Sequence, residues 1–381
     1  MQKLYYFVSI ILFALTANAQ VFNQSISDEI QKVDSVLNQL IAYENIGTKP
    51  TGSPALVETL QWITNKYKFY GYAPVIDTFK IGSNESYNII IEKQGTNPSQ
   101  WIIIGAHYDS VDESPGANDN GSGVVATLKI ARIIKDLIPK IGVRIINFGA
   151  EEQGFIGSSH YVKNKLLASD SILLMLNLDQ LGGTKGEDNS KIYCERDDDT
   201  NPSSNNAISS LMTDTLSNLI SLYTNLTPVI SDAYSSDYVP FENEGMIITG
   251  LYQESDYSDH YHKSTDLVSN MDVDATVEVI KGTLAATLYF SKMNGFISVN
   301  EVLNKHYDLN PNPAVNYLTI SGIINPVQIE IFNTQGSKLL SQEACPNEQI
   351  KLFDLSNGLY TVSISDHVNN LKIHSKLIIA R

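Results

Sequence analysis

The stretch GVRIINFGAEEQ (142–153) decides how the rest of the chain is interpreted. A largely apolar run ends here in two adjacent glutamates, Glu151 and Glu152. A short apolar run of this kind is typical of a strand that is buried on both faces of a sheet. Two neighbouring carboxylates repel each other at such a place, so they indicate a cation or a catalytic purpose.

Further buried strands alternate with helices on either side of this stretch. WIIIGAH (101–107), SILLMLNLD (171–179) and MIITGLY (246–252) are also short apolar runs, and VIDTFK and SYNIIIEK indicate two strands before them. Helical spacing of apolar residues predicts helices over residues 28–44, 54–70, 123–137, 205–223 and 275–292. This alternation predicts an α/β fold, with a mainly parallel twisted sheet flanked by helices.

The character of the chain changes after this region. From residue 309 it consists of short alternating runs separated by Asn-Gly-type turns, and the Asn/Pro-rich segment 310–313 marks the change. This pattern predicts a small C-terminal β-sandwich. We therefore expect a catalytic domain over residues 20–297, a linker over 298–310 and the sandwich over 311–381.

The N-terminus predicts export. Lys3 precedes the apolar run 4–15, and the small residues Ala17 and Ala19 flank a cleavage site, so residues 1–19 are expected to be a signal peptide. The apolar run is short for a membrane span, and no Cys follows it to carry a lipid. The net charge of −16 over 381 residues argues against nucleic acid as a partner. Only two cysteines, Cys194 and Cys345, are present, so no disulfide framework is expected.

Ionisable residues follow each of the buried strands. They are His107, Asp109, Asp119, Glu151, Glu152, Asp179 and His262. Because the carboxyl ends of parallel strands meet at one edge of a sheet, these side chains are expected to converge there. Two histidines with several carboxylates form a donor set that suits zinc. Two metals would need a bridging carboxylate, and Asp109 is placed two residues from His107 to orient the imidazole ring.

The glutamate pair fits this site. On an extended segment, adjacent side chains point to different sides, so one glutamate can bind a cation while the other faces the metal-bound water. The second would then act as a general base. The acidic segment 195–206 nearby is expected to be a solvated surface loop, with a calcium site as the alternative.

GAHYDS, GANDNGSGV, NFGAEEQGFIGSSHYV, LNLDQLG and DHYHKSTD together resemble the co-catalytic two-zinc aminopeptidases of the MH clan, the bacterial leucyl aminopeptidase type. The resemblance covers residues 28–295. It implies two Zn²⁺ per chain, with His107 and Asp179 on one, Glu152 and His262 on the other, and Asp119 between them. It also implies Glu151 as the general base acting on a metal-bridging water, Asp109 as the residue that orients His107, and Tyr261 as the oxyanion donor. Tyr238 is the alternative donor, in a segment where the family usually has His.

The C-terminal segment resembles the type IX secretion sorting domain through NPNPAVNYLTI, IEIFNTQGSKLL, FDLSNGLYTVSI and the basic end KLIIAR. This resemblance implies transport by the type IX machinery to the surface or exterior of a Gram-negative cell. The expected partners are that machinery and peptides with a free N-terminus.

Three alternative functions remain open from the sequence alone. Glutaminyl-peptide cyclotransferases share the His, Glu-Glu and final His landmarks but use one zinc, and they depart from the form NDNGSG (118–123) seen here. A carboxypeptidase of the same clan would need a cation for the substrate carboxylate, and the metal motifs hold none apart from Lys263 at their end. A non-catalytic binding module would have lost ligand positions, whereas all five are present.

Overall fold

The computed structural model describes residues 22–167, 169–197, 202–253, 259–293, 308–321, 326–333, 337–346, 348–366 and 371–381. The predicted signal peptide and most of the predicted linker lie outside these residues. The chain divides into two compact units, Met1–Phe296 and Ile297–Arg381, which are described separately.

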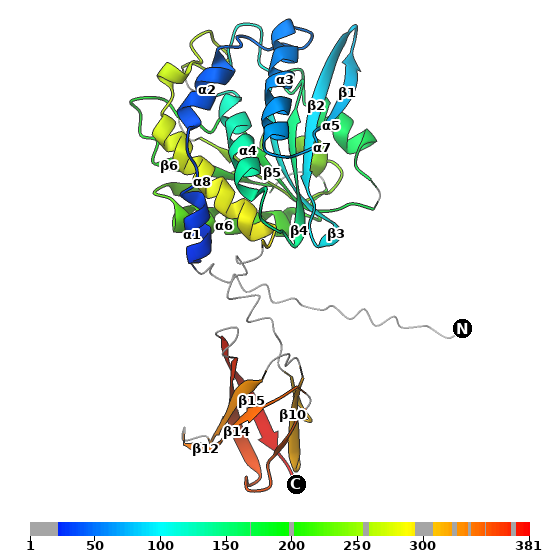
Figure 1. The fold of residues 1–381 in the computed structure, drawn as a ribbon, viewed down its shortest axis with the longest axis vertical. Helices are drawn as coiled ribbons and strands as arrows, with labels where there is room; N and C mark the ends of the chain where they lie inside the picture. Colours follow the sequence, from blue (N-terminus) through cyan, green and yellow to red (C-terminus); the bar gives the residue numbers. More distant parts are fainter. Residues whose placement is uncertain are drawn as a thin grey trace, which may run out of the picture. The chain divides into compact units, whose positions relative to one another are not determined.

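The first unit is built on an eight-stranded sheet with the order β1-β2-β4-β3-β5-β8-β6-β7 (Figure 1). Its strands are β1 (Val75–Ile81), β2 (Asn84–Lys93), β3 (Asn97–His107), β4 (Ile141–Phe148), β5 (Ser171–Leu178), β6 (Lys191–Arg196), β7 (Thr227–Asp232) and β8 (Ile248–Tyr252). The central strands β4, β3, β5 and β8 are parallel to one another. The antiparallel pairs β1–β2, β2–β4 and β6–β8 lie on either side of them. The prediction of a mainly parallel sheet is therefore confirmed.

The sheet is buried on both faces. Ile102 and Ile104 of β3 pack into the larger hydrophobic core, whereas Ile103 between them packs into the core on the other face. Met175 of β5 shares that second core, and its neighbour Leu176 belongs to the first. Since side chains alternate along a strand, a strand covered on both sides must be apolar throughout, as the sequence shows.

Helices cover each face (Figure 1). The larger core is covered by α1 (Gln24–Ile30), α2 (Val36–Glu44), α3 (Pro54–Phe69), α4 (Gly121–Ile134), α6 (Asn206–Tyr223) and α8 (Val273–Phe290), with the short 3₁₀ turn η1 (Val268–Asn270) beside α2. The smaller core is covered by α5 (Ile156–Asn164) and α7 (Val239–Glu242). Within the described residues, no helix combines the length and apolarity that crossing a membrane requires.

Two local predictions are wrong. Residues 28–44 do not form one helix, because Ser35 has a φ of 54°, a left-handed conformation that separates α1 from α2. Residues 195–206 are not a surface loop throughout, because Glu195 and Arg196 end strand β6. The polar composition of this segment hid a strand that lies between β7 and β8.

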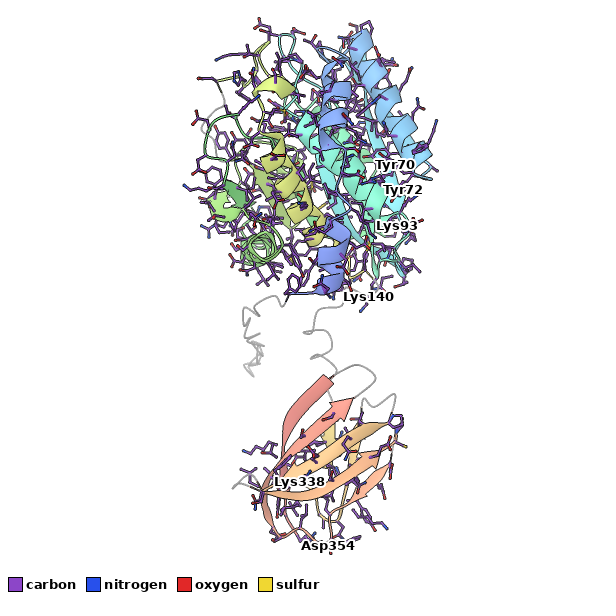
Figure 2. All side chains as sticks on the ribbon, turned by 60° about the vertical axis from the view of Figure 1, so that its left-hand side comes forward. Tyr70, Tyr72, Lys93, Lys140, Lys338 and Asp354 are labelled. Carbon is purple, nitrogen blue, oxygen red and sulfur yellow. The ribbon has the colours of Figure 1, made fainter. Side chains whose placement is uncertain are left out.

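The second unit forms two antiparallel sheets around one core. Strands β9 (Asp308–Asn310), β10 (Tyr317–Ser321) and β13 (Gln349–Lys351) make one sheet. Strands β11 (Val327–Phe332), β12 (Lys338–Ala344), β14 (Gly358–Asp366) and β15 (Leu371–Ile379) make the other. Inward residues of both sheets, such as Ile320 and Ile329, share the core, and Lys338 and Asp354 are labelled on this unit in Figure 2. The predicted β-sandwich is confirmed.

Candidate metal centre

The predicted ligands converge at the carboxyl end of the parallel strands. His107 is the last residue of β3, Glu152 follows β4, and Asp179 comes directly after β5. Asp119 lies just before α4, and His262 lies in the loop after β8. Ligand atoms of His107, Glu151 and Asp179 lie within 4.8 Å of one another, as do those of His107, Asp119 and Glu152.

Asp119 lies between two groups of donors. Its Oδ1 is 3.2 Å from Nε2 of His107, which is 3.4 Å from Oδ1 of Asp179. Its Oδ2 is 3.3 Å from Nε2 of His262, which is 3.1 Å from Oε2 of Glu152. The two oxygens of one carboxylate thus face two different histidines, as a bridging ligand does.

These distances fit zinc better than hydrogen bonds. A ring nitrogen carries at most one hydrogen, yet Nε2 of His107 faces both Asp119 and Asp179. Neighbouring ligands on tetrahedral zinc with bonds of about 2.0–2.1 Å are about 3.3 Å apart, which matches the four separations. In addition, Oε1 of Glu152 and Oδ1 of Asp179 are buried without a hydrogen-bond partner among the described residues. The residues present therefore fit zinc.

The pKa values of the candidate ligands reflect how close these ionisable groups lie to one another. Burial opposes ionisation of Asp119, but hydrogen bonds from His107 and His262 lower the pKa of its carboxyl to about 2. Hydrogen bonds to Asp119 and Glu152 raise the pKa of His262 to about 10. Burial raises the pKa of Glu151 well above its usual range. A divalent cation would offset this concentration of negative charge.

Asp109 holds the glutamate pair in place. Its Oδ1 accepts a hydrogen bond from the backbone N–H of Glu151 (3.1 Å), and its Oδ2 accepts one from that of Glu152 (3.2 Å). Nδ1 of His107 lies 3.7 Å from the Asp109 carboxylate but 3.2 Å from its backbone carbonyl. The carbonyl is thus the acceptor that orients the ring, and the carboxylate instead fixes the turn after β4.

That turn departs from the extended segment expected for Glu151 and Glu152. Ala150 has a φ of 60°, and Glu151 O accepts hydrogen bonds from the N–H groups of Gly154 and Phe155. His262 also has a positive φ, of 57°. Non-glycine residues adopt this conformation rarely, and such residues concentrate at functional sites. From this turn, the Glu151 carboxylate lies 4.0 Å from His107 and the Glu152 carboxylate lies 3.1 Å from His262.

Three residues in and around the site were missed by the sequence analysis. The Asp266 carboxylate accepts hydrogen bonds from the backbone N–H groups of Asn118 (2.8 Å) and Asp119 (3.1 Å). The Ser236 hydroxyl donates to Oδ2 of Asp179 at 2.7 Å. Glu195, at the end of β6, lines the same cavity. The local signal for a strand is that buried Ile192 and Cys194 alternate with Tyr193 and Glu195 in KIYCER.

The candidate metal ligands open into a cavity of about 460 Å³. Glu151, Glu152, Asp179 and His262 lie in its wall, together with several aromatic residues. Tyr261 is among these, and its ring stacks on His262 with 3.8 Å between centroids. Tyr238 also lines the cavity, but its hydroxyl donates to Oε1 of Glu195 (3.1 Å) and accepts from the Tyr234 N–H (2.7 Å).

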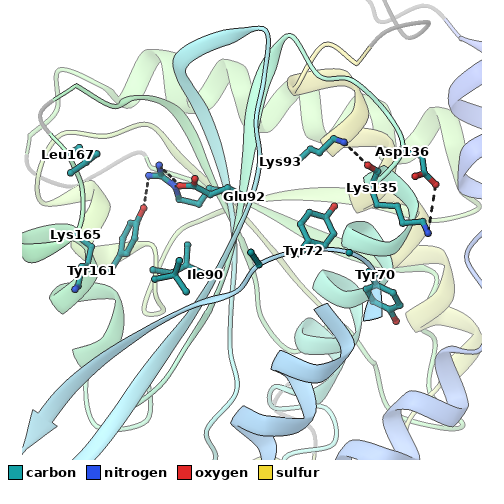
Figure 3. A pocket seen from close by; sticks show the side chains of 14 residues that line it. Tyr70, Tyr72, Ile90, Glu92, Lys93, Lys135, Asp136, Tyr161, Lys165 and Leu167 are labelled. Carbon is teal, nitrogen blue, oxygen red and sulfur yellow. Dashed lines mark hydrogen bonds and ion pairs between the residues drawn. The ribbon is translucent and has the colours of Figure 1, made fainter. Parts of the chain in front are cut away.

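A second cavity, of about 770 Å³, shares none of these lining residues (Figure 3). Tyr70, Tyr72 and Lys93 mark its position in Figure 2. Its cations are already paired: Arg144 contacts Glu92 at 2.7 Å and Lys165 contacts Asp77 at 3.1 Å. Lys93 donates to the Lys135 carbonyl, and Lys135 lies 3.8 Å from Asp136. Each of these four cations thus already has a contact within the protein, and that of Lys93 is with a neutral carbonyl.

Comparison with known proteins supports the same family. Residues 88–287 match the model of Peptidase family M28, and residues 308–380 match the Secretion system C-terminal sorting domain. Leupeptin-inactivating enzyme 1 of Streptomyces exfoliatus is 26% identical over 384 residues, covering 90% of this chain and 84% of that protein. An aminopeptidase of Pseudomonas aeruginosa is 32% identical over 219 residues, covering 50% of this chain and 39% of that protein. The chain thus spans about two fifths of the length of this second relative.

Solved structures share the fold. The LapA aminopeptidase of Legionella pneumophila has a TM-score of 0.62 and 20% identity, covering 70% of this chain and 75% of that one. Glutaminyl cyclase of Porphyromonas gingivalis has a TM-score of 0.58 and 20% identity, and the match covers 67% of this chain and 96% of that one. The fold therefore does not separate peptidases from cyclases, whereas the relatives found by sequence include proteins named as aminopeptidases. The prediction of a metallo-aminopeptidase is confirmed, and the tail marks a secreted or cell-surface protein. The chain belongs to Peptidase family M28 and ends in a secretion-system sorting domain.

Proposed function

We propose that this protein is a secreted aminopeptidase that uses two zinc ions to hydrolyse the first peptide bond of substrates with a free N-terminus. The observation that supports this most strongly is the position of Asp119, whose two carboxylate oxygens face His107 and His262 separately. In this proposal His107 and Asp179 hold one ion, Glu152 and His262 hold the other, and Asp119 bridges them. When bound, such ions act as Lewis acids on the carbonyl group and lower the pKa of water toward neutrality.

Glu151 is the proposed general base. Its carboxylate lies in the cavity wall, 4.0 Å from Nε2 of His107, and its backbone is held by Asp109. It takes the proton of the attacking water and delivers it to the leaving amine. Asp109 positions both glutamates rather than contacting the substrate.

Tyr261 is the proposed donor to the developing oxyanion. Its ring stacks on His262, which places it beside the proposed second ion. The alternative, Tyr238, already uses its hydroxyl on Glu195 and the Tyr234 backbone. This arrangement supports Tyr261 over Tyr238.

The alternatives explain fewer observations. A single-zinc cyclase would need only one of the two groups of donors around Asp119. A carboxypeptidase would need a cation for the substrate carboxylate, and the described residues that line the cavity include neither Lys nor Arg. An acidic cavity instead suits the substrate's free α-amine.

A panel of aminoacyl-nitroanilides tests this function. We expect turnover that a chelator abolishes and added Zn²⁺ restores, because every proposed step needs the metal centre. Acetylated substrates should resist cleavage, since they lack the cationic amine. Formation of pyroglutamate from a Gln-peptide, without release of nitroaniline, would instead support the cyclase.

Export is the second part of the proposal. We propose that residues 1–19 direct the chain across the inner membrane and that the type IX machinery of a Gram-negative cell then carries it outward, using the C-terminal unit. Deleting Ile297–Arg381 should leave the aminopeptidase activity in the periplasm, because the catalytic unit has its own core. Fractionated cultures would show this directly. Equal activity in the medium with and without the C-terminal unit would contradict a sorting role.

A further inference from the structure

Glu195 is an acidic residue in the cavity wall that the proposed mechanism does not use. It lies on β6, which is separated from β5 by β8 alone. Its backbone carbonyl accepts hydrogen bonds from the hydroxyls of Thr213 (3.1 Å) and Thr249 (2.9 Å), and its Oε1 accepts one from Tyr238. The residue is therefore fixed at both its main chain and its carboxyl group.

Gly250 makes room for the carboxyl group. In the sheet, Gly250 of β8 pairs with Glu195 on one side and with Asn177 of β5 on the other. A Cβ atom at Gly250 would lie 2.4 Å from Oε2 of Glu195 and 3.2 Å from the ring of Tyr238. The Glu195 side chain thus crosses the position where a β8 side chain would stand. It leans from β6 toward β5, the strand that Asp179 follows.

Among the described residues of the cavity wall, no Lys or Arg pairs with Glu195. The other carboxylates of the wall, Glu151, Glu152 and Asp179, belong to the proposed metal centre, where bound ions would offset their charge. The described lining residues include no Lys or Arg. Burial therefore raises the pKa of Glu195 to about 8. A ligand cation at this carboxyl would stabilise its ionised form.

We propose that Glu195 forms the floor of the subsite for the first side chain of the substrate and selects a basic residue there, Lys or Arg. This inference rests on the aminopeptidase function proposed above. The axes of β5 and β6 are two strand spacings apart, roughly 10 Å, so Glu195 lies beyond the α-amine, which must stay beside the scissile carbonyl. A long side chain extends into this region.

The walls of the subsite suit such a side chain. Tyr193 and Tyr252, paired across β6 and β8, line the cavity with parallel rings whose centroids are 6.4 Å apart. Aromatic faces attract ammonium and guanidinium groups and pack against aliphatic stems. The combination of aromatic walls and one acidic group is selective for a cation.

The test compares arginyl-, citrullyl- and leucyl-nitroanilide with the wild-type enzyme and with Glu195→Gln. Citrulline has nearly the shape of arginine without its charge, and Gln still accepts the Tyr238 hydrogen bond. We expect the wild type to favour arginine over citrulline, and Glu195→Gln to lower kcat/KM for arginine by about 10- to 100-fold, as loss of a charge-assisted hydrogen bond does. The kcat/KM values for citrullyl- and leucyl-nitroanilide should change by less than about threefold.

Two further variants sharpen the result. Glu242→Gln is the matched control, because Glu242 is a buried glutamate that does not line this cavity, and it should keep the arginine preference. Gly250→Ala should lose the preference, because its methyl group displaces the Glu195 carboxyl group.

A wild type that cleaves leucine but does not distinguish arginine from citrulline overturns the inference. Equal losses on all three substrates in Glu195→Gln overturn it too, since they indicate a structural role or binding of the α-amine. Absence of turnover on every substrate instead refutes the aminopeptidase function itself.

Discussion

Glu151→Gln should lower kcat by about 10²–10⁴-fold, the usual cost of losing a general base, while bound zinc stays at the wild-type level. Gln keeps the size of the side chain but cannot accept the proton of the attacking water. The backbone N–H of residue 151 still donates to Asp109, so the turn after β4 should be preserved. Kinetics and metal analysis on the same preparation measure both quantities.

The neighbouring residue is the control for this result. Glu152→Gln makes the same chemical change one position later, in a side chain that lies 3.1 Å from His262. It should lose metal as well as activity, and excess Zn²⁺ should partly restore turnover. Loss of zinc in Glu151→Gln with retention in Glu152→Gln would mean that the two roles are reversed. Near-normal kcat in Glu151→Gln would refute the general-base role.

Asp119→Asn should have the largest effect on metal content. Because one oxygen of Asp119 faces His107 and the other faces His262, this change weakens both proposed positions at once. Removing a supporting hydrogen bond from a metal ligand typically costs 10–100-fold in affinity, so the loss of a bridging ligand should exceed about 100-fold. Activity should fall to the level of the chelated enzyme.

Zinc stoichiometry distinguishes Asp119→Asn from a variant such as Glu152→Gln, which removes a proposed ligand of one ion only. Under limiting Zn²⁺ we expect about half of the wild-type metal in Glu152→Gln and almost none in Asp119→Asn, if the metal centre is binuclear. Added Zn²⁺ should also raise the Tm of the wild type more than that of Asp119→Asn, because only metal bound to the folded state stabilises it. Equal zinc content in the wild type and Asp119→Asn would rule out a bridging role.

Part of the site was predictable because local sequence determines it. Buried parallel strands must be apolar throughout, so their ends can be found in the sequence, and ionisable residues directly after them stand out. Since parallel strands present their carboxyl ends at one edge, residues as distant as His107 and His262 could be expected to meet there. The structure places their Nε2 atoms 3.2 and 3.3 Å from the two oxygens of Asp119.

The supporting residues were not predictable in this way. Asp266 holds a backbone that is about 150 positions away in the chain, and Ser236 reaches Asp179 from a different loop. Nothing local to Asp266 or Ser236 distinguishes a buried acceptor or donor from a solvated one. The positive φ of Ala150 likewise cannot be deduced from an alanine, which adopts that conformation only when its surroundings impose it.

The sequence by itself determined the α/β class, the C-terminal sandwich and the set of residues that converge at the proposed metal centre, because hydrophobic period and strand ends are local properties. Only the tertiary structure decided what surrounds that centre. Strand β6 lies between β7 and β8 in the sheet, and this order brings Glu195 and Gly250 into contact from segments 55 residues apart. An acidic run such as the one after Glu195 has the composition of a solvated loop. Whether one of its carboxylates is buried in a cavity depends on which strand lies beside it, and that is a property of the whole sheet.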